Sequence, residues 1–283
     1  MTTIVATQES GTRPLAIEER ETLPSAEEFR TRYAARSKPV VFRGGIRDWP
    51  AFREWTPEYL AEKVGGNEIN VQQSPTGIFG LDPEKGGPRF EEVKTTLGAY
   101  VHSMMNITEG DIRYYVQRVN IPEKLPELKD DFSLPSYVDA AKVYLINLWM
   151  GPAGNVTTLH YDTPNNFLAQ VRGRKRLKMF SPWQARRLYP CRSKAYNMSR
   201  VNIDAPDLER FPRFADAQMY EVEIEEGDLL FIPTYWWHQV YSETAGISVN
   251  IWFIPMYRQL IGPQLWDNLP DIARELTNRA GPR

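Results

Sequence analysis

Apolar and polar positions alternate along the chain in a way that predicts mainly β-structure, concentrated after residue 140. Residues 174–180 alternate with a period of two, and residues 166–171 form a second strand, so the Arg-Gly pair between them predicts a two-residue hairpin turn. Residues 143–150 and 229–232 are continuously apolar, as expected of strands buried on both faces. Further strands are predicted at residues 39–42, 67–72, 111–120 and 220–224 and around His238 and Asn250.

Helical patterns lie mainly in the first hundred or so residues and at the C-terminal end, with one short helix predicted at residues 183–189. Three helices are predicted at residues 25–36, 56–64 and 95–105. Ser25 with Glu28 forms a capping box for the first, and Thr56 caps the second just before a proline. We therefore expect order to begin at Ser25.

Three parts follow from these patterns. Residues 1–23 are polar, carry no clear period and predict a flexible arm. Residues 24–256 contain the strands and predict one domain, and residues 257–283 predict a short helical tail. The strand count and turns predict a double-stranded β-helix, a jelly-roll barrel of two facing sheets with the N-terminal helices covering one of them.

Composition limits the class of protein. The chain has 283 residues and a formal net charge of −2, so no overall basic field favours nucleic acid. Its single cysteine excludes intramolecular disulfides and argues against a structural zinc site. A signal peptide and an apolar run long enough for a membrane helix are both absent from the sequence, so we expect a cytoplasmic protein.

Candidate metal ligands come from the histidines, of which there are three. His160 and Asp162 lie two positions apart, and on a strand they share one face. His238 follows a buried strand and an aromatic run, whereas His102 lies off the apolar stripe of its helix and is interpreted as structural. Two histidines and one carboxylate predict a facial triad that holds Fe(II) with three open positions.

An inward cation is predicted beside this pair. Lys175 shares its strand face with Leu177 and Met179, while the neighbouring cations Arg174, Arg176 and Lys178 face the other way. The two-residue turn would pair Gln170 with Lys175 and Asn166 with Met179, so that Asn166 shares the face of the lysine. The alternative is a lysine that snorkels from an edge strand.

The combined pattern of His160, Asp162, Lys175 and His238 resembles the JmjC/cupin family of Fe(II)- and 2-oxoglutarate-dependent oxygenases. GNVTTLHYD, NFLAQVRGRKR, DAPDLERFPRF, GDLLFIPTYWWH and VNIW are similar to the asparaginyl hydroxylases of this family. NIDAPDL, GDLLFIP and GISVNI are similar to its tRNA wybutosine hydroxylases. The resemblance extends from about Pro24 to Phe253.

The resemblance implies roles for further residues. The far carboxylate of 2-oxoglutarate would meet Lys175, with hydroxyls from Thr157 and Tyr115. Asn166 and Asn250 would lie near the metal-bound end of 2-oxoglutarate, and Trp252 would form a wall. O₂ would complete the reactants, and the products would be succinate, CO₂ and a hydroxylated or demethylated substrate.

The substrate residues implied by the resemblance are Gln117 and the pair Asn197 and Met198. Asparaginyl hydroxylases carry Arg-Gln where this chain has Asn197-Met198, so an asparagine target is in doubt. Two irregular connections, residues 77–90 and 194–214, are expected to border the site.

A protein or peptide side chain is the favoured substrate, and a modified tRNA base or a small metabolite is the alternative. The outward cations of residues 174–178, with Arg186 and Arg187, could serve RNA or could be an ordinary solvated surface. A catalytically silent cupin scaffold is a third hypothesis, against which the complete triad argues. The C-terminal helical tail could form a homodimer, as in the asparaginyl hydroxylases.

Overall fold

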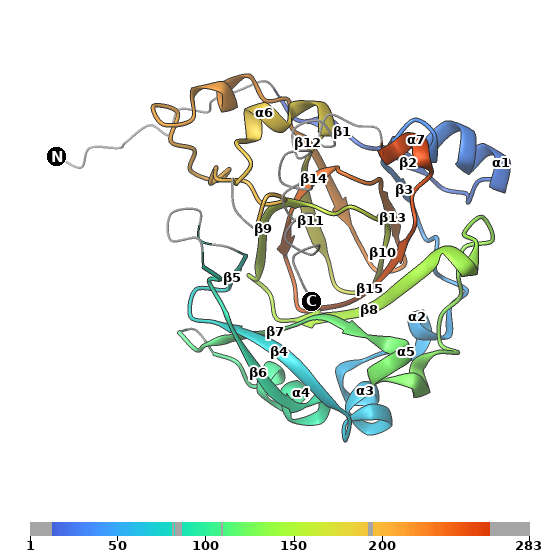
Figure 1. Ribbon diagram of the computed structural model, residues 1–283. Coiled ribbons are helices and arrows are strands. Elements are labelled where there is room, and N and C mark those ends of the chain that lie inside the picture. The colour runs from blue at the N-terminus through green and yellow to red at the C-terminus, as the bar shows by residue number, and fades with distance from the viewer. Residues whose placement is uncertain (1–12, 81, 83–86, 109, 192–194, 261–283) are drawn as a thin grey trace, which may run out of the picture.

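Two β-sheets face each other and form a barrel (Figure 1). The computed structural model describes residues 13–80, 82, 87–108, 110–191 and 195–260. In this part of the chain the smaller sheet has the strand order β1-β12-β11-β14-β9-β5, and the larger has the order β2-β3-β13-β10-β15-β8-β7-β4-β6. The mainly β jelly roll predicted from the sequence is confirmed.

The smaller sheet contains β1 (Leu15–Ala16), β5 (Ile78–Phe79), β9 (Val156–Tyr161), β11 (Lys175–Phe180), β12 (Tyr220–Ile224) and β14 (Trp237–Ser242). The larger sheet contains β2 (Glu18–Arg20), β3 (Val40–Phe42), β4 (Glu68–Ser74), β6 (Glu91–Thr96), β7 (Arg113–Asn120), β8 (Val143–Gly151), β10 (Asn165–Arg172), β13 (Leu229–Ile232) and β15 (Gly246–Phe253). The helices are α1 (Ala26–Glu28), α2 (Pro50–Glu54), α3 (Pro57–Val64), α4 (Leu97–Met105), α5 (Ile121–Lys124), α6 (Ala185–Leu188) and α7 (Tyr257–Leu260). Shorter helical segments are the π-helical Phe29–Ala34 and the 3-10 segments Pro126–Leu128, Ala140–Lys142, Pro182–Gln184 and Pro212–Asp216.

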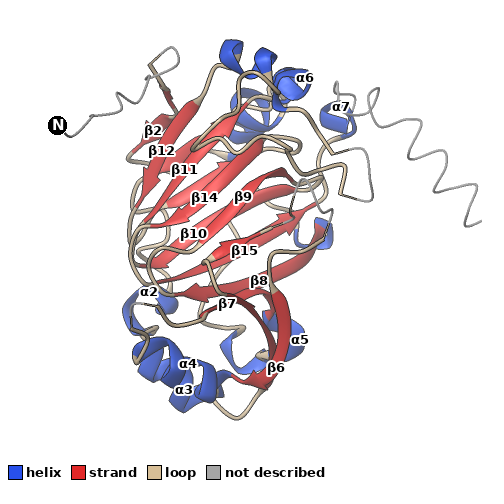
Figure 2. Ribbon diagram, turned by 90° about the vertical axis from the view of Figure 1, so that its left-hand side faces the viewer, coloured by secondary structure: helices blue, strands red, loops and turns tan. Residues whose placement is uncertain are grey.

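Strand β10 separates the two hydrophobic layers of the domain. Phe167, Ala169 and Val171 point away from the barrel into a cluster that also contains side chains of α3 and α4. Leu168 points the other way, into a cluster between the two sheets. The helices of the first half therefore cover the outer face of the larger sheet, and Figure 2 shows α2, α3, α4 and α5 gathered at one end of it. The barrel interior is left for a site.

The predicted hairpin between residues 166–171 and 174–180 is wrong. Strand β10 pairs with β13 and β15 in the larger sheet, whereas β11 pairs with β12 and β14 in the smaller one. Gln170 is therefore not paired with Lys175, nor Asn166 with Met179. The turn carries the chain from one sheet to the other, because a jelly roll pairs strands from distant parts of the sequence.

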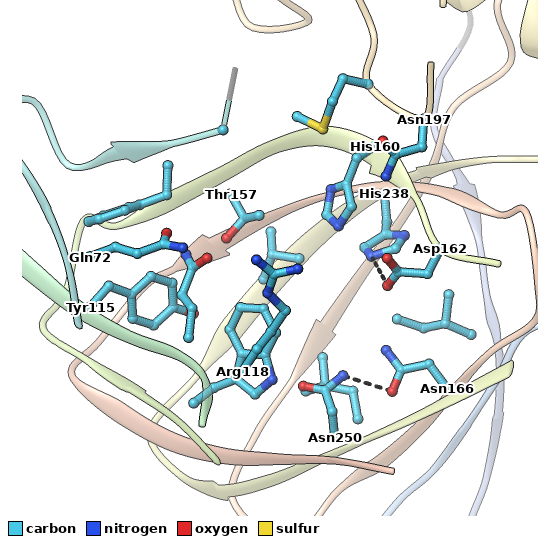
Figure 3. Close-up of a pocket in the computed structure, with 18 of the residues that line it drawn as sticks. Gln72, Tyr115, Arg118, Thr157, His160, Asp162, Asn166, Asn197, His238 and Asn250 are labelled. Carbon is cyan, nitrogen blue, oxygen red and sulfur yellow. Dashed lines mark hydrogen bonds and ion pairs between the residues drawn. The ribbon is translucent and has the colours of Figure 1, made fainter. Parts of the chain in front are cut away.

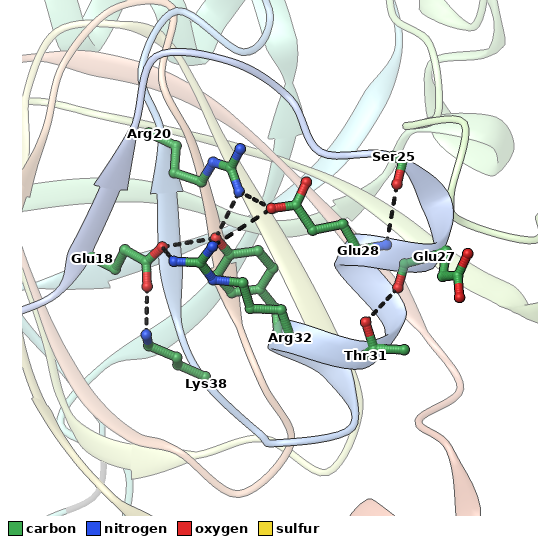
Figure 4. A network of polar contacts seen from close by, with 9 residues as sticks. Glu18, Arg20, Ser25, Glu27, Glu28, Thr31, Arg32 and Lys38 are labelled. Atoms are coloured by element: carbon green, nitrogen blue, oxygen red, sulfur yellow. Dashed lines mark hydrogen bonds and ion pairs between the residues drawn. The ribbon is translucent and has the colours of Figure 1, made fainter.

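Ordered structure begins before Ser25. The prediction of a flexible arm is therefore wrong for residues 15–20, which form strands β1 and β2. Strand β1 pairs in parallel with β12, and β2 pairs in parallel with β3. Glu18 accepts hydrogen bonds from Arg32, Tyr33 and Lys38, and Arg20 bonds Glu28 (Figure 4). These partners lie on later elements, which explains why a local pattern did not predict them.

Ser25 and Thr56 cap the two helices as predicted, but the Glu28 carboxylate pairs with Arg20 and Arg32 rather than completing a capping box. The Ser25 hydroxyl accepts a hydrogen bond from the Glu28 amide, and the Thr56 hydroxyl accepts one from the Tyr59 amide. The first helix continues as a π-helical turn from Phe29, which the capping signal did not indicate. Within the described residues no helix has the length and apolarity to cross a membrane. The helical tail beyond α7, with its proposed dimer contact, lies outside the described residues.

Candidate metal centre and its cavity

His160, Asp162 and His238 meet where β9 pairs with β14. His160 lies opposite His238 in the strand register, and Asp162 follows directly after β9. The two imidazole centroids are 4.3 Å apart, and Nε2 of His238 lies 3.8 Å from Oδ2 of Asp162. One potential ligand atom from each residue lies within 4.8 Å of the others (Figure 3). This group could hold a metal ion, and its donor set suits Fe(II).

Hydrogen bonds fix which ring nitrogen of each histidine is free. Nδ1 of His160 lies 2.8 Å from the carbonyl oxygen of Thr158, and Nδ1 of His238 lies 2.9 Å from that of Trp236. A carbonyl oxygen only accepts, so each Nδ1 carries the proton and each Nε2 presents its lone pair. Such backbone bonds orient a metal-binding imidazole and raise its basicity as a ligand. Both rings are thus prepared to bind a metal.

Burial keeps His238 neutral. Its side chain lies in the barrel and the residue is only 4% exposed. Burial, together with the neighbouring His160, lowers the pKa of His238 to about 4 from its ordinary value of 6.5. Asp162 opposes this shift but does not reverse it. A neutral imidazole at physiological pH is the form that a metal needs.

We expect the metal-free protein to lose stability as the pH falls from 6.5 to about 4, because His238 then binds a proton in the unfolded chain but not in the folded one. The contribution of this one group is about 3 kcal/mol over that window. Denaturant unfolding of wild-type protein and His238→Asn across the window measures it, and the variant should show a shallower pH dependence. His102→Asn, an exposed histidine on α4, is the matched control. Equal slopes for wild type and His238→Asn would contradict the expectation.

The triad opens into a cavity of about 570 Å³ inside the barrel mouth. A volume of this size is ordinary for a small-molecule site. The cavity brings together every site residue predicted from the sequence: Tyr115, Gln117, Thr157, His160, Asp162, Asn166, Lys175, Asn197, Met198, His238, Asn250 and Trp252. Both irregular connections border it, through Phe79, Gly80 and Phe90 and through Ala195, Asn197 and Met198, as expected.

Lys175 reaches the cavity from β11 and is 4% exposed. Strand β11 lies between β12 and β14, so this lysine does not snorkel from a sheet edge. Its Nζ lies 3.3 Å from the Tyr115 hydroxyl, and in the part of the chain that the structure describes it has no salt bridge to a carboxylate. A buried ammonium without a counter-charge is unfavourable, so the site calls for an anion here.

The polar side chains around Lys175 are held in place by neighbours. Asn250 donates a hydrogen bond to the side-chain oxygen of Asn166 at 2.7 Å. Gly151 leaves room for the Tyr115 ring, since a Cβ at this position would lie 2.7 Å from a ring carbon. Phe79 and Trp149 pack edge-on against the same ring. The Tyr115 hydroxyl is thereby directed towards Lys175.

The two tryptophans of the aromatic run before His238 belong to the core, and Tyr235 is half-buried. Trp237 is fully buried against Tyr161, and Trp236 packs against Tyr220 in the cluster between the sheets. His102 is exposed on α4, in agreement with its structural interpretation.

Several lining residues were not predicted from the sequence. The polar or charged ones are Gln72 on β4, Arg118 on β7 and Trp149 on β8. Gln72 and Trp149 lie in strands with no motif around them, so no sequence signal indicated that they face the cavity. Arg118 follows Gln117 directly, and the period of two placed it on the opposite face.

Comparison with known proteins gives a consistent result. A family model described as a cupin-like domain matches residues 25–259. The chain is 34% identical over 235 residues to lysine-specific demethylase 8 of Xenopus tropicalis, covering 81% of this chain and 51% of that protein. It is 30% identical to JmjC domain-containing protein D of Dictyostelium discoideum, covering 80% of this chain and 54% of that protein. It is 29% identical to tRNA wybutosine-synthesizing protein 5 of Homo sapiens, covering 91% of this chain and 80% of that protein. The chain spans about half the length of the first two proteins.

Proposed function

The chain belongs to the cupin-like JmjC domain family, and we propose that it is an Fe(II)- and 2-oxoglutarate-dependent oxygenase that hydroxylates a protein or peptide side chain. The observation that carries the proposal is one cavity containing both a two-histidine, one-carboxylate group and the buried Lys175, which has no carboxylate partner among the described residues. The first suits Fe(II), and the second suits the far carboxylate of a dicarboxylic cosubstrate.

Each lining residue then has a defined task. His160, Asp162 and His238 would hold the metal, and bound Fe(II) would supply oxygen activation coupled to oxidation of 2-oxoglutarate to succinate and CO₂. Lys175 would bind the far carboxylate, assisted by the hydroxyls of Tyr115 and Thr157.

The remaining predicted residues would orient the two organic reactants. Asn166 and Asn250 form a hydrogen-bonded pair that would lie beside the metal-bound end of the cosubstrate. The indole of Trp252 would wall that end off from water, and Gln117, Asn197 and Met198 would contact the substrate. These residues position the partners, while the oxygen chemistry belongs to the metal.

Pairing of the outward cations supports a protein or peptide substrate over RNA. Arg174 pairs with Glu223, Arg176 with Glu221 and Glu243, and Lys178 with Asp204. Cations already neutralised by carboxylates on the same surface form no basic stripe for a phosphate backbone. The relative named tRNA wybutosine-synthesizing protein 5 supports RNA as the second candidate. Relatives named lysine-specific demethylases support demethylation as a variant of the same chemistry.

Anaerobic reconstitution with Fe(II) and 2-oxoglutarate, followed by exposure to O₂, tests the proposal. We expect succinate formation that a peptide substrate stimulates, with a mass increase of one oxygen on the peptide. Candidate peptides, tRNA and metabolites are compared by mass spectrometry, and their binding is measured at several salt concentrations. A peptide should show a shallow dependence on salt, whereas tight tRNA binding that weakens steeply with salt would promote the RNA candidate. Failure of the reconstituted protein to bind Fe(II) or 2-oxoglutarate would favour a silent scaffold.

A further inference from the structure

Arg118 enters the cavity through an irregularity in strand β7. Val116 pairs with Met150 and Val119 pairs with Leu148 on β8, so the register shifts between them. Two residues, Gln117 and Arg118, therefore lie opposite Trp149 alone. Consecutive residues of a regular strand point to opposite faces, yet both of these line the cavity. The irregularity is a β-bulge that turns an extra side chain inward.

The backbone of Arg118 is strained. Its φ is +55°, in the left-handed region that side chains other than glycine and asparagine rarely adopt. Strain of this kind costs free energy and is concentrated at functional sites. An arginine on an ordinary strand face would need no such backbone. The conformation has the specific effect of directing a guanidinium into the cavity, where Figure 3 shows it amid the labelled side chains.

Two buried hydrogen-bond donors without partners lie at this bulge, and the cavity-lining buried acceptor without a partner is Oε1 of Gln72. Arg118 makes no salt bridge or side-chain hydrogen bond in the part of the chain that the structure describes. The buried indole nitrogen of Trp149, directly across the bulge, likewise has no partner. A guanidinium and an indole N–H can only donate, so their missing partner must carry acceptor atoms. The amide nitrogen of Gln117 is a second buried donor without a partner.

The cavity with metal and cosubstrate bound would contain one more positive than negative charge. If the proposed function holds, the metal's two positive charges and Lys175 balance Asp162 and the two carboxylates of 2-oxoglutarate. The two histidines are neutral metal ligands. Of the charged residues that line the cavity, only Arg118 then lacks a counter-charge. Arg118 is an exposed residue and is solvated in the free protein. A substrate that covers the cavity displaces that water, and a carboxylate on the substrate would then supply the acceptor atoms that the guanidinium needs.

We propose that the β7 bulge forms a carboxylate-binding subsite for the primary substrate, in which Arg118 is a specificity-determining residue and Trp149 and Gln117 supply further donors. A single guanidinium with neighbouring neutral donors matches one planar carboxylate, which it can bind through two hydrogen bonds. The carboxylate belongs to an acidic side chain of a peptide or to a free carboxylic acid. The inference rests on the proposed function and names the chemistry of its substrate.

Binding to protein loaded with Mn(II) and 2-oxoglutarate without O₂ tests the subsite. One arm selects binders from a library of random short peptides, and the other titrates aspartate and glutamate beside asparagine and glutamine. Wild-type protein is expected to prefer carboxylates over their amides in at least one arm. The arm that shows the preference identifies whether the carboxylate belongs to a peptide or to a free acid. Arg118→Asn, which tolerates the left-handed backbone, should weaken carboxylate binding roughly tenfold to a hundredfold and abolish the preference. Arg118→Lys should retain part of it.

Arg187→Asn, at an exposed arginine on α6, is the matched control and should behave as wild type. Affinity for 2-oxoglutarate is measured in every variant and should not change. The inference is overturned if neither arm prefers carboxylates, if Arg118→Asn keeps the preference, or if that variant loses 2-oxoglutarate instead. Binding of an RNA oligonucleotide that depends on Arg118 would also overturn it, by identifying a phosphate. If wild-type protein binds no 2-oxoglutarate, the proposed function fails rather than the subsite alone.

Discussion

Alanine at His160, Asp162 or His238 is expected to abolish tight Fe(II) binding and succinate formation. Each substitution leaves two protein ligands, and the geometry offers no replacement: the group of described His, Cys, Asp and Glu side chains that could hold the ion has just these three members. Loss of a mere supporting contact to a metal ligand typically costs about 10- to 100-fold in affinity or activity, so loss of a ligand should exceed that range.

Anaerobic Fe(II) titration followed by succinate measurement checks this result. His102→Ala provides a matched control, since it removes an exposed histidine of α4 and should leave both measurements unchanged. Denaturant unfolding of the metal-free variants separates loss of the ligand from loss of the fold. Substantial turnover by any of the three alanine variants would mean that the ligands are wrongly assigned.

The faces of strands could be predicted from the sequence far better than their partners. The period of two correctly put Lys175 inside and Arg176 and Lys178 outside, because side-chain direction is a local property of an extended chain. Pairing is not local. The same segment was assigned to a hairpin, whereas its partners β12 and β14 lie more than forty residues further along the chain.

The dependence of strand pairing on distant residues also explains why other elements were not predicted. Residues 15–20 are ordered only through pairing with β12 and β3, and the polar edge strand β6 has no apolar alternation to reveal it. Arg118 escaped prediction because the bulge contains no glycine to mark it. The metal group was predicted because it consists of rare residue types, and its geometry needs only one strand pair, β9 with β14.

Lys175→Ala is expected to weaken 2-oxoglutarate binding strongly while leaving metal occupancy nearly intact. The ammonium of Lys175 is buried beside Tyr115 and has no carboxylate partner among the described residues, so the cosubstrate would be its only counter-charge. Truncating one member of a buried charge pair typically costs about 2 to 5 kcal/mol. That corresponds to a loss of affinity of roughly 30-fold to several thousandfold.

The stability of the free protein distinguishes this role from a structural one. Without cosubstrate, removal of this buried ammonium should leave the free energy of unfolding unchanged or raise it, because the substitution breaks no ion pair among the described residues and loses only the hydrogen bond to the Tyr115 hydroxyl. Lys178→Ala is the control on the same strand, since Lys178 faces outward and pairs with Asp204. It should leave 2-oxoglutarate affinity unaltered. If titration of Lys175→Ala gives the wild-type affinity, the anion that Lys175 binds is not 2-oxoglutarate, and the cosubstrate lies elsewhere in the cavity.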